Sequence, residues 1–249
     1  MTDLAKMISR FDQASRVTAA EAERHYTSVH FPFAQQLLAA MPQIRSYHIN
    51  RVVRQLDLAG GWAQRPSAWR FVVLRFDPGR SLEFDALTTE RITRDHINFL
   101  RHLRSTVVTE NMLFDRLHRH TALQKYLIEV DRPAGATSIT CDNLLTDLGA
   151  TLTEEAATRF GARQVCCSRV LAELAAEAVE EEGQRATDQP IADTDKVGYI
   201  EIYFDDERWG ADLFRSPKVL TALRDPSLLC KTYVIEERCG VDRRAPTGH

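Results

Sequence analysis

The chain has 249 residues, of which 44% are hydrophobic and 27% are charged, and its formal net charge is −3. This composition is typical of a globular protein and excludes a disordered or collagen-like chain. The charge also argues against a general nucleic-acid binder, which needs a basic surface to displace counterions from phosphates.

The sequence carries no signal for a membrane or for an oxidising compartment. No apolar run reaches the ~18 residues of a membrane span, and Met1-Thr2-Asp3-Leu4 lacks the basic and apolar segments of a signal peptide. Five cysteines, an odd number without regular spacing, indicate reduced thiols. We therefore expect a cytoplasmic protein that binds neither nucleic acid nor membrane.

The first half of the chain has the pattern of a β-α-β-β-α-β unit. A capping box at Thr18 and Glu21 begins a helix whose apolar residues recur at helical spacing until Pro42. A second helix is expected over 81–104. The β-branched and aromatic content predicts strands at 4–11, 44–53, 69–76 and 107–114. This is the element order of a ferredoxin-like unit.

The second half repeats that order. Strands are expected at 126–130, 165–171, 197–204 and 232–236. Thr151 and Glu154 offer a capping box before a short helix, and Ser216-Pro217 begins the second of two helical pieces within 206–223. The acidic stretch 179–195 is interpreted as an exposed insertion.

The two halves also align locally, because 45–52 matches 163–170 and 71–77 matches 199–205. We therefore predict an α+β fold of two ferredoxin-like lobes, 1–120 and 121–241, followed by a flexible tail, 242–249. Each lobe leaves one sheet face without helices, and two lobes can bury these faces by packing sheet to sheet. The space between the sheets is a natural cavity for a small molecule.

Two groups of motifs resemble a known family. His25-Tyr26-x-x-x-His30-x-Pro32, followed by Pro42-x-Ile44-x-x-Tyr47-x-x-Asn50, resembles the first-helix and second-strand signature of EthD-like proteins of the dimeric α+β barrel superfamily. Gly198-Tyr199-x-Glu201-x-x-Phe204-Asp205-Asp206, with Ser216-Pro217 behind it, resembles the third strand and following helix of that family. The second half lacks a counterpart of the His-Tyr-x-x-x-His motif, which favours one pocket whose polar groups come unequally from the two lobes.

The resemblance implies that the two lobes pack sheet to sheet as a dimeric α+β barrel, and it also implies a range of chemistry. The superfamily includes polyketide cyclases, cofactor-independent anthrone-type monooxygenases, lactone isomerases, and haem proteins such as chlorite dismutase. Chlorite dismutase has two fused lobes and takes an axial histidine from the second one. Because His249 is the only histidine after His120 in this chain, we expect neither haem nor any other cofactor.

Strand alternation assigns side chains to the two faces of each strand. His48 and Asn50 share one face of their strand and are expected to line the cavity, although His48 could instead lie at a solvated rim. Tyr199, Glu201 and Tyr203 share the face that looks between the sheets.

The cavity-facing carboxylate has two interpretations. Partial burial would raise the pKa of Glu201 toward neutrality, which prepares a general acid or base. The alternative is a salt bridge from Glu201 to Arg75 or Arg169 that holds the lobes together. His30, in the family-like motif, is a second candidate for proton transfer; the alternative is a hydrogen-bonded core histidine.

No other motif indicates a site. Histidines, cysteines and carboxylates do not occur at metal-site spacing, so no metal is expected. Phosphate-loop, dinucleotide and Gly-x-Ser-x-Gly patterns are also missing from the sequence. The predicted catalytic residues are His48, Glu201 and His30, and the predicted substrate-binding residues are Asn50, Tyr47, Phe71, Arg75, Tyr199 and Tyr203.

Three functions follow from this pocket. The first is a cofactor-independent cyclase, isomerase or lyase that acts by acid–base catalysis on a small aromatic or polyketide-like substrate. The second is a cofactor-independent monooxygenase of a phenol or anthrone. The third is a non-enzymatic protein that binds such a molecule. The chain is expected to be a monomer or a homodimer.

Overall fold

The computed structural model describes residues 4–59, 61–80, 82–117, 123–178 and 195–243. The predicted lobe boundary at 120/121, residues 179–194 of the predicted insertion 179–195 and residues 244–249 of the predicted tail 242–249 lie outside the described residues, and Asp242, the first residue of that tail, belongs to the last strand. The first half of the chain consists of β1 (Ala5–Gln13), α1 (Ala19–His25), the π-helical segment η1 (Tyr26–His30), α2 (Phe31–Ala40), β2 (Ile44–Gln55), β3 (Arg70–Phe76), α3 (Ala86–His96) and β4 (Leu100–Asp115). The second half consists of β5 (Gln124–Asp131), α4 (Ser138–Ala157), β6 (Ala162–Ala178), β7 (Lys196–Phe204), α5 (Glu207–Leu213), α6 (Pro217–Leu223) and β8 (Leu229–Asp242).

The strands form one closed antiparallel barrel in the order β1-β3-β2-β8-β5-β7-β6-β4. Each half contributes four neighbouring strands, and the halves meet where β2 pairs with β8 and where β4 pairs with β6. The expected barrel is therefore confirmed, and the two groups of strands are joined along both pairs of edges, so they form one closed sheet and not two separate stacked sheets. Closing the barrel pairs the backbone N–H and C=O groups of β2, β4, β6 and β8, which would be exposed at the edges of two separate sheets.

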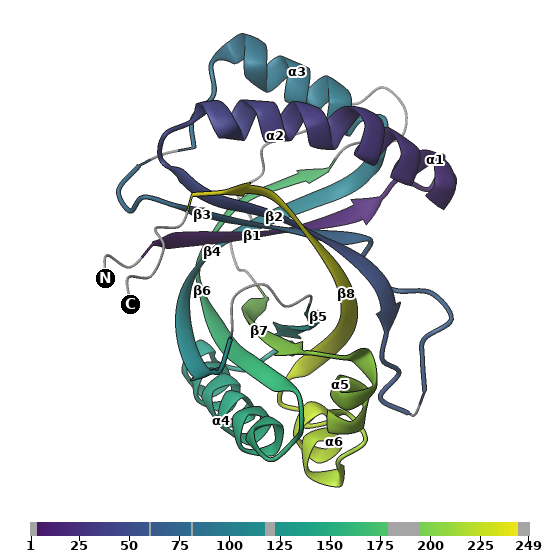
Figure 1. The fold of residues 1–249 in the computed structure, drawn as a ribbon, viewed down its shortest axis with the longest axis vertical. Helices are drawn as coiled ribbons and strands as arrows, with labels where there is room; N and C mark the ends of the chain where they lie inside the picture. Colours follow the sequence, from purple (N-terminus) through teal and green to yellow (C-terminus); the bar gives the residue numbers. More distant parts are fainter. Residues whose placement is uncertain (1–3, 60, 81, 118–122, 179–194, 244–249) are drawn as a thin grey trace.

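Helices cover the outside of the barrel on two opposite sides. Figure 1 shows α1, α2 and α3 over the strands of the first half and α4, α5 and α6 over those of the second. Apolar side chains at alternate strand positions point outward to these helices, as Val72 and Leu74 do below α1–α3 and Ile200 and Ile202 do below α4–α6. The intervening side chains point into the barrel.

The aligned segments of the two halves make equivalent contacts. Arg45 of β2 donates two hydrogen bonds of 2.7 Å to Asp77 at the end of β3. Arg163 of β6 makes the same two-pronged contact with Asp205 after β7. These four residues occupy matching positions of the alignment, so the structure supports the internal repeat.

Two predicted helices differ from the structure. α3 ends at His96, and 100–104 already belong to β4, where Leu100 lies opposite Gln13 of β1. The predicted capping box at Thr151 and Glu154 is wrong, because both residues lie inside α4, which begins after the N-cap Thr137. The capping box at Thr18 and Glu21 is confirmed. Among the described residues, no helix has the length and apolar character needed to cross a membrane.

Candidate active site

The structure divides the predicted site residues between the inside and the outside of the barrel. His30 and Tyr47 lie outside, under the helices of the first half. The other predicted residues lie inside: His48, Asn50, Phe71, Arg75, Tyr199, Glu201 and Tyr203.

Packed apolar side chains fill the middle of the barrel. The Phe71 ring lies 5.3 Å from the ring of Tyr233 and 6.5 Å from that of Tyr199, measured between centroids. All three side chains are at most 1% exposed. The expected open space between the sheets is therefore occupied here, and Phe71 and Tyr199 are core residues. The remaining buried members of this central cluster are Ile8, Ala68, Val73, Val108, Leu127 and Ile235.

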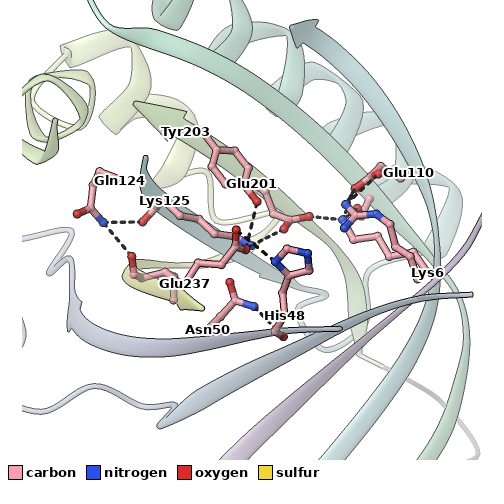
Figure 2. A network of polar contacts seen from close by, with 12 residues as sticks. Lys6, His48, Asn50, Glu110, Gln124, Lys125, Glu201, Tyr203 and Glu237 are labelled. Carbon is pink, nitrogen blue, oxygen red and sulfur yellow. Dashed lines mark hydrogen bonds and ion pairs between the residues drawn. The ribbon is translucent and has the colours of Figure 1, made fainter. Parts of the chain in front are cut away.

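Charged side chains form a buried network at one end of the barrel (Figure 2). Glu201, on β7, lies at its centre and is 1% exposed. Its two carboxylate oxygens contact Lys6 of β1 and Lys125 of β5, the latter at 2.7 Å. Lys6 also contacts Glu110, and Lys125 also contacts Glu237 at 2.7 Å. Arg75 binds Glu110 at 2.9 Å and is the last member of the network. The carboxylates of Glu110, Glu201 and Glu237 thus alternate with the positively charged side chains.

This environment gives Glu201 the opposite pKa shift to the one expected. Burial acts to raise the pKa of Glu201, but attraction to Lys125, Lys6 and Arg75 outweighs it and holds the pKa well below its ordinary value. Glu201 is therefore ionised at neutral pH, and the expected shift of its pKa toward neutrality is wrong. Glu201 does form salt bridges, as the alternative interpretation expected, but its partners are Lys6 and Lys125. Arg169, one of the two expected partners, lies 3.8 Å from Asp142.

His48 and Asn50 lie beside this network on β2 and are 8% and 0% exposed. His48 Nδ1 is 3.6 Å from Glu237 Oε1. His48 Nε2 and Asn50 Oδ1 are buried and have no hydrogen-bond partner among the described residues. A buried polar atom without a partner costs about 1–3 kcal/mol. Two such atoms on neighbouring inward positions of one strand can be satisfied by water or by a bound molecule.

The network is open to solvent at its outer edge. The side chains of Glu237, Glu110 and Arg75 are 25%, 22% and 19% exposed, whereas those of Lys6 and Lys125 are 1% exposed. These three side chains therefore reach the surface at this end of the barrel, while His48 beside them is buried. Two surface hollows of about 410 and 430 Å³ lie elsewhere, and neither is lined by His48, Asn50 or Glu201.

Tyr203 is the predicted binding residue closest to this edge. Its hydroxyl lies 3.5 Å from Glu237 Oε2, and its ring lies 5.2 Å from Lys125 Nζ. Burial, followed by the charge of Glu237, raises the pKa of Tyr203 well above its ordinary value, so the phenol stays protonated.

His30 is not part of the site. It lies at the end of η1, where its Nδ1 is 2.6 Å from Asp95 Oδ2 on α3. Asp95 Oδ1 also lies 2.7 Å from His25 Nε2, so one carboxylate links two histidines. Burial lowers the pKa of His30, partly offset by the hydrogen bond to Asp95. His30 is the hydrogen-bonded core residue of the alternative interpretation.

Tyr47 is likewise a packing residue. It is 2% exposed, and its ring lies 6.0 Å from that of Phe31 on α2. It precedes His48 on β2, so the pleat directs it to the opposite face of the strand.

Four buried charged residues of the network were not predicted from the sequence: Lys6, Glu110, Lys125 and Glu237. Lysine and glutamate in strands are usually exposed, so nothing in their own segments indicated burial. The internal repeat could have indicated them, because Lys6 and Lys125 occupy equivalent positions at the starts of β1 and β5.

A second ionic cluster lies at the other end of the barrel, beyond the apolar middle. Glu129 is 0% exposed and contacts Arg10 at 2.7 Å, Lys196 at 2.7 Å and the hydroxyl of Tyr233 at 3.0 Å. The charged groups of this cluster form ion pairs with one another, although Glu129 Oε1 has no hydrogen-bond partner among the described residues. Across the described parts of the chain, no group of three or more His, Cys, Asp or Glu side chains is arranged to hold a metal ion.

Comparisons with known proteins identify the fold. No protein-family model matches the chain, and no curated protein sequence matches it. An anthrone oxidase-like protein of known structure superposes with a TM-score of 0.58 at 12% identity, covering 99% of this chain and 97% of its own. A candidate monooxygenase from Fusobacterium nucleatum subsp. nucleatum superposes with a TM-score of 0.52 at 8% identity, covering 96% and 95%. This likeness concerns the fold alone: the chain has the same overall fold as these two proteins.

Proposed function

We propose that this chain is a cofactor-independent monooxygenase of a small aromatic or polyketide-like substrate, with His48 as the base that starts the reaction. The observation that carries the proposal is the pair of unpartnered atoms, His48 Nε2 and Asn50 Oδ1, at the solvent-accessible end of the barrel.

Among the buried titratable groups at this end, His48 suits proton transfer best. Histidine is the side chain whose charge changes near neutral pH. The carboxylates beside it are held ionised by lysines, and the pKa of Tyr203 is raised. Asn50 Nδ2 donates one long hydrogen bond, of 3.4 Å, to the backbone oxygen of His48. The second N–H of Nδ2 can donate to a substrate oxygen on which negative charge develops, whereas Oδ1 can only accept a hydrogen bond, for instance from a substrate hydroxyl.

The reaction needs only dioxygen beside the substrate. His48 takes a proton from a CH₂ group activated by flanking aromatic rings, and the carbanion transfers electrons to dioxygen as a carbon–oxygen bond forms. Loss of the second C–H proton and cleavage of the O–O bond leave a C=O group and release water. The sum R₂CH₂ + O₂ → R₂C=O + H₂O conserves atoms and electrons.

Two structural neighbours support the monooxygenase function, since one is an anthrone oxidase-like protein and the other a candidate monooxygenase. The resemblance of the His25–Pro32 and Gly198–Asp206 motifs to EthD-like proteins agrees with it. Cyclase, isomerase or lyase chemistry would use the same proton abstraction without dioxygen, and a binding protein would use the same contacts without turnover.

Oxygen uptake with a panel of anthrones and related phenols tests the proposal. The wild-type protein is expected to consume one dioxygen per ketone formed. His48→Gln is expected to lower kcat by about 10²-fold or more. The matched control is His102→Gln, because His102 lies on β4 with its side chain 46% exposed.

The other outcomes are distinguishable. Full activity of His48→Gln would contradict the proposal. A rearranged or cyclised product without oxygen uptake would indicate the cyclase, isomerase or lyase function. Binding without any product would indicate a small-molecule binding protein.

We also propose that the halves 1–120 and 121–241 are ferredoxin-like lobes. The proposal leaves out the predicted tail 242–249 as a whole, because Asp242 is the last residue of β8. The support is the repeated element order and the strand order within each half, β4-β1-β3-β2 and β8-β5-β7-β6. A monomer would already contain the closed barrel, and a homodimer would pair outer surfaces. Sedimentation equilibrium distinguishes the two.

A further inference from the structure

We propose that Glu237 is a positioning residue for His48, and that Lys125 holds Glu237 in place for this task. The inference rests on the proposed function, because it assigns a role to residues that act through the proposed base.

Glu237 offers different partners to its two carboxylate oxygens (Figure 2). Oε1 faces His48 Nδ1 at 3.6 Å, slightly beyond hydrogen-bond length. Contacts of this kind are often long without substrate and shorten when it binds. Oε2 accepts a hydrogen bond of 2.7 Å from Lys125 and lies 3.5 Å from the Tyr203 hydroxyl. The carboxylate is thus anchored on one side and aimed at the imidazole on the other.

Lys125 is itself fixed. Its side chain is 1% exposed and also contacts Glu201 at 2.7 Å. Burial acts to raise the pKa of Glu237, but the charge of Lys125 and the contact with His48 outweigh it and hold the pKa far below its ordinary value. Glu237 therefore presents a negative charge to His48 Nδ1 at neutral pH.

An ionised carboxylate opposite Nδ1 selects the tautomer of the imidazole. The proton stays on Nδ1, where it faces the negative charge, and the lone pair stays on Nε2. Nε2 is the atom that lacks a partner in the structure. The carboxylate would also stabilise the imidazolium that forms when His48 takes a proton, as the acid of a catalytic triad does for its histidine.

The internal repeat contains the same ion pair without the histidine. Lys6 and Glu110 occupy the positions in β1 and β4 that Lys125 and Glu237 occupy in β5 and β8, and they also contact each other. The residue aligned with His48 is Cys166, whose Sγ lies 3.3 Å from Met112 Sδ. One copy of the Lys–Glu pair thus faces a base and the other faces a thiol, which provides a control within the same molecule.

The test compares Glu237→Gln with Glu110→Gln. In Glu237→Gln, the ammonium group of Lys125 should donate its hydrogen bond to the new amide oxygen, so that the amide NH₂ group faces His48 Nδ1. The proton would then move to Nε2 and block the base. Long-range ¹⁵N NMR of histidine-labelled protein, with His48 assigned from His48→Gln, reads the tautomer directly.

The expected result is the Nδ1–H tautomer in the wild type and in Glu110→Gln, and the Nε2–H tautomer in Glu237→Gln. With an active substrate, Glu237→Gln should lose about 10²-fold or more in kcat with little change in KM, and Glu110→Gln should lose less than about threefold. Glu237→Asp, which retains the charge, should recover part of the loss.

An Nε2–H tautomer of His48 in the wild-type protein would by itself overturn the inference. Equal losses of kcat in Glu237→Gln and Glu110→Gln would also overturn it. The NMR measurement needs no substrate. The predicted tautomers without any turnover would therefore leave the positioning role standing and remove the proposed reaction.

Discussion

Replacing Glu129 by Gln tests whether the interior charges stabilise the barrel as their geometry implies. Burial acts to raise the pKa of Glu129, but attraction to Lys196 and Arg10 lowers it from 4.5 to about 2. At about 1.4 kcal/mol per unit, this shift corresponds to about 3 kcal/mol of stabilisation of the ionised form. Removal of one member of a buried ion pair costs a similar amount, about 3–5 kcal/mol.

The sign of the pH dependence follows from the direction of the shift. The pKa is lower in the folded state, so the stabilisation is complete above about pH 4.5 and is lost as pH falls toward about 2. Urea denaturation at several pH values should show Glu129→Gln to be less stable than the wild type by about 3–5 kcal/mol at pH 7. The difference should shrink steadily between pH 4.5 and the lowest accessible pH.

The control is Glu90→Gln, which removes an exposed i,i+4 pair with Arg94 and should cost under about 1 kcal/mol. A Glu129→Gln protein as stable as the wild type at pH 7, or with an unchanged pH dependence, would refute the reasoning.

Three further predictions concern packing and reactivity. Gly198→Ala should lower the free energy of unfolding by about 2–3 kcal/mol, because its methyl group would collide with the backbone oxygen of Ser168; chemical denaturation measures this. Cys239, which is exposed, should react first with a thiol reagent at pH 8, whereas Cys166, whose pKa is raised by burial, should react only on unfolding. His30→Gln should cost about 1–3 kcal/mol of stability through its lost contact with Asp95 while leaving turnover unchanged, and reduced turnover in a folded variant would return His30 to the site.

The sequence predicted the strands and their facing well, because alternation is a local property. The positions of His48 and Asn50 on one face of β2, and of Tyr199, Glu201 and Tyr203 on the inward face of β7, follow from the two-residue period alone. The repeat between the halves predicted which strands are equivalent.

The failures concern contacts between distant segments. Lys6 and Glu201 are 195 positions apart, so no local pattern shows that they meet. Without the lysines, burial alone was the basis for expecting a raised pKa of Glu201, and the sign was wrong. The length of α4 was missed because Thr151 and Glu154 imitate a capping box inside a helix that Thr137 begins.

The most direct test of the central claim is proton abstraction itself. An anthrone is incubated with the protein in D₂O without dioxygen, and loss of the activated C–H signal is followed by ¹H NMR. The account predicts exchange that is accelerated by the wild type and by His102→Gln and reduced to the uncatalysed rate by His48→Gln. Catalysed exchange that persists in His48→Gln would show that another group is the base and would contradict the account.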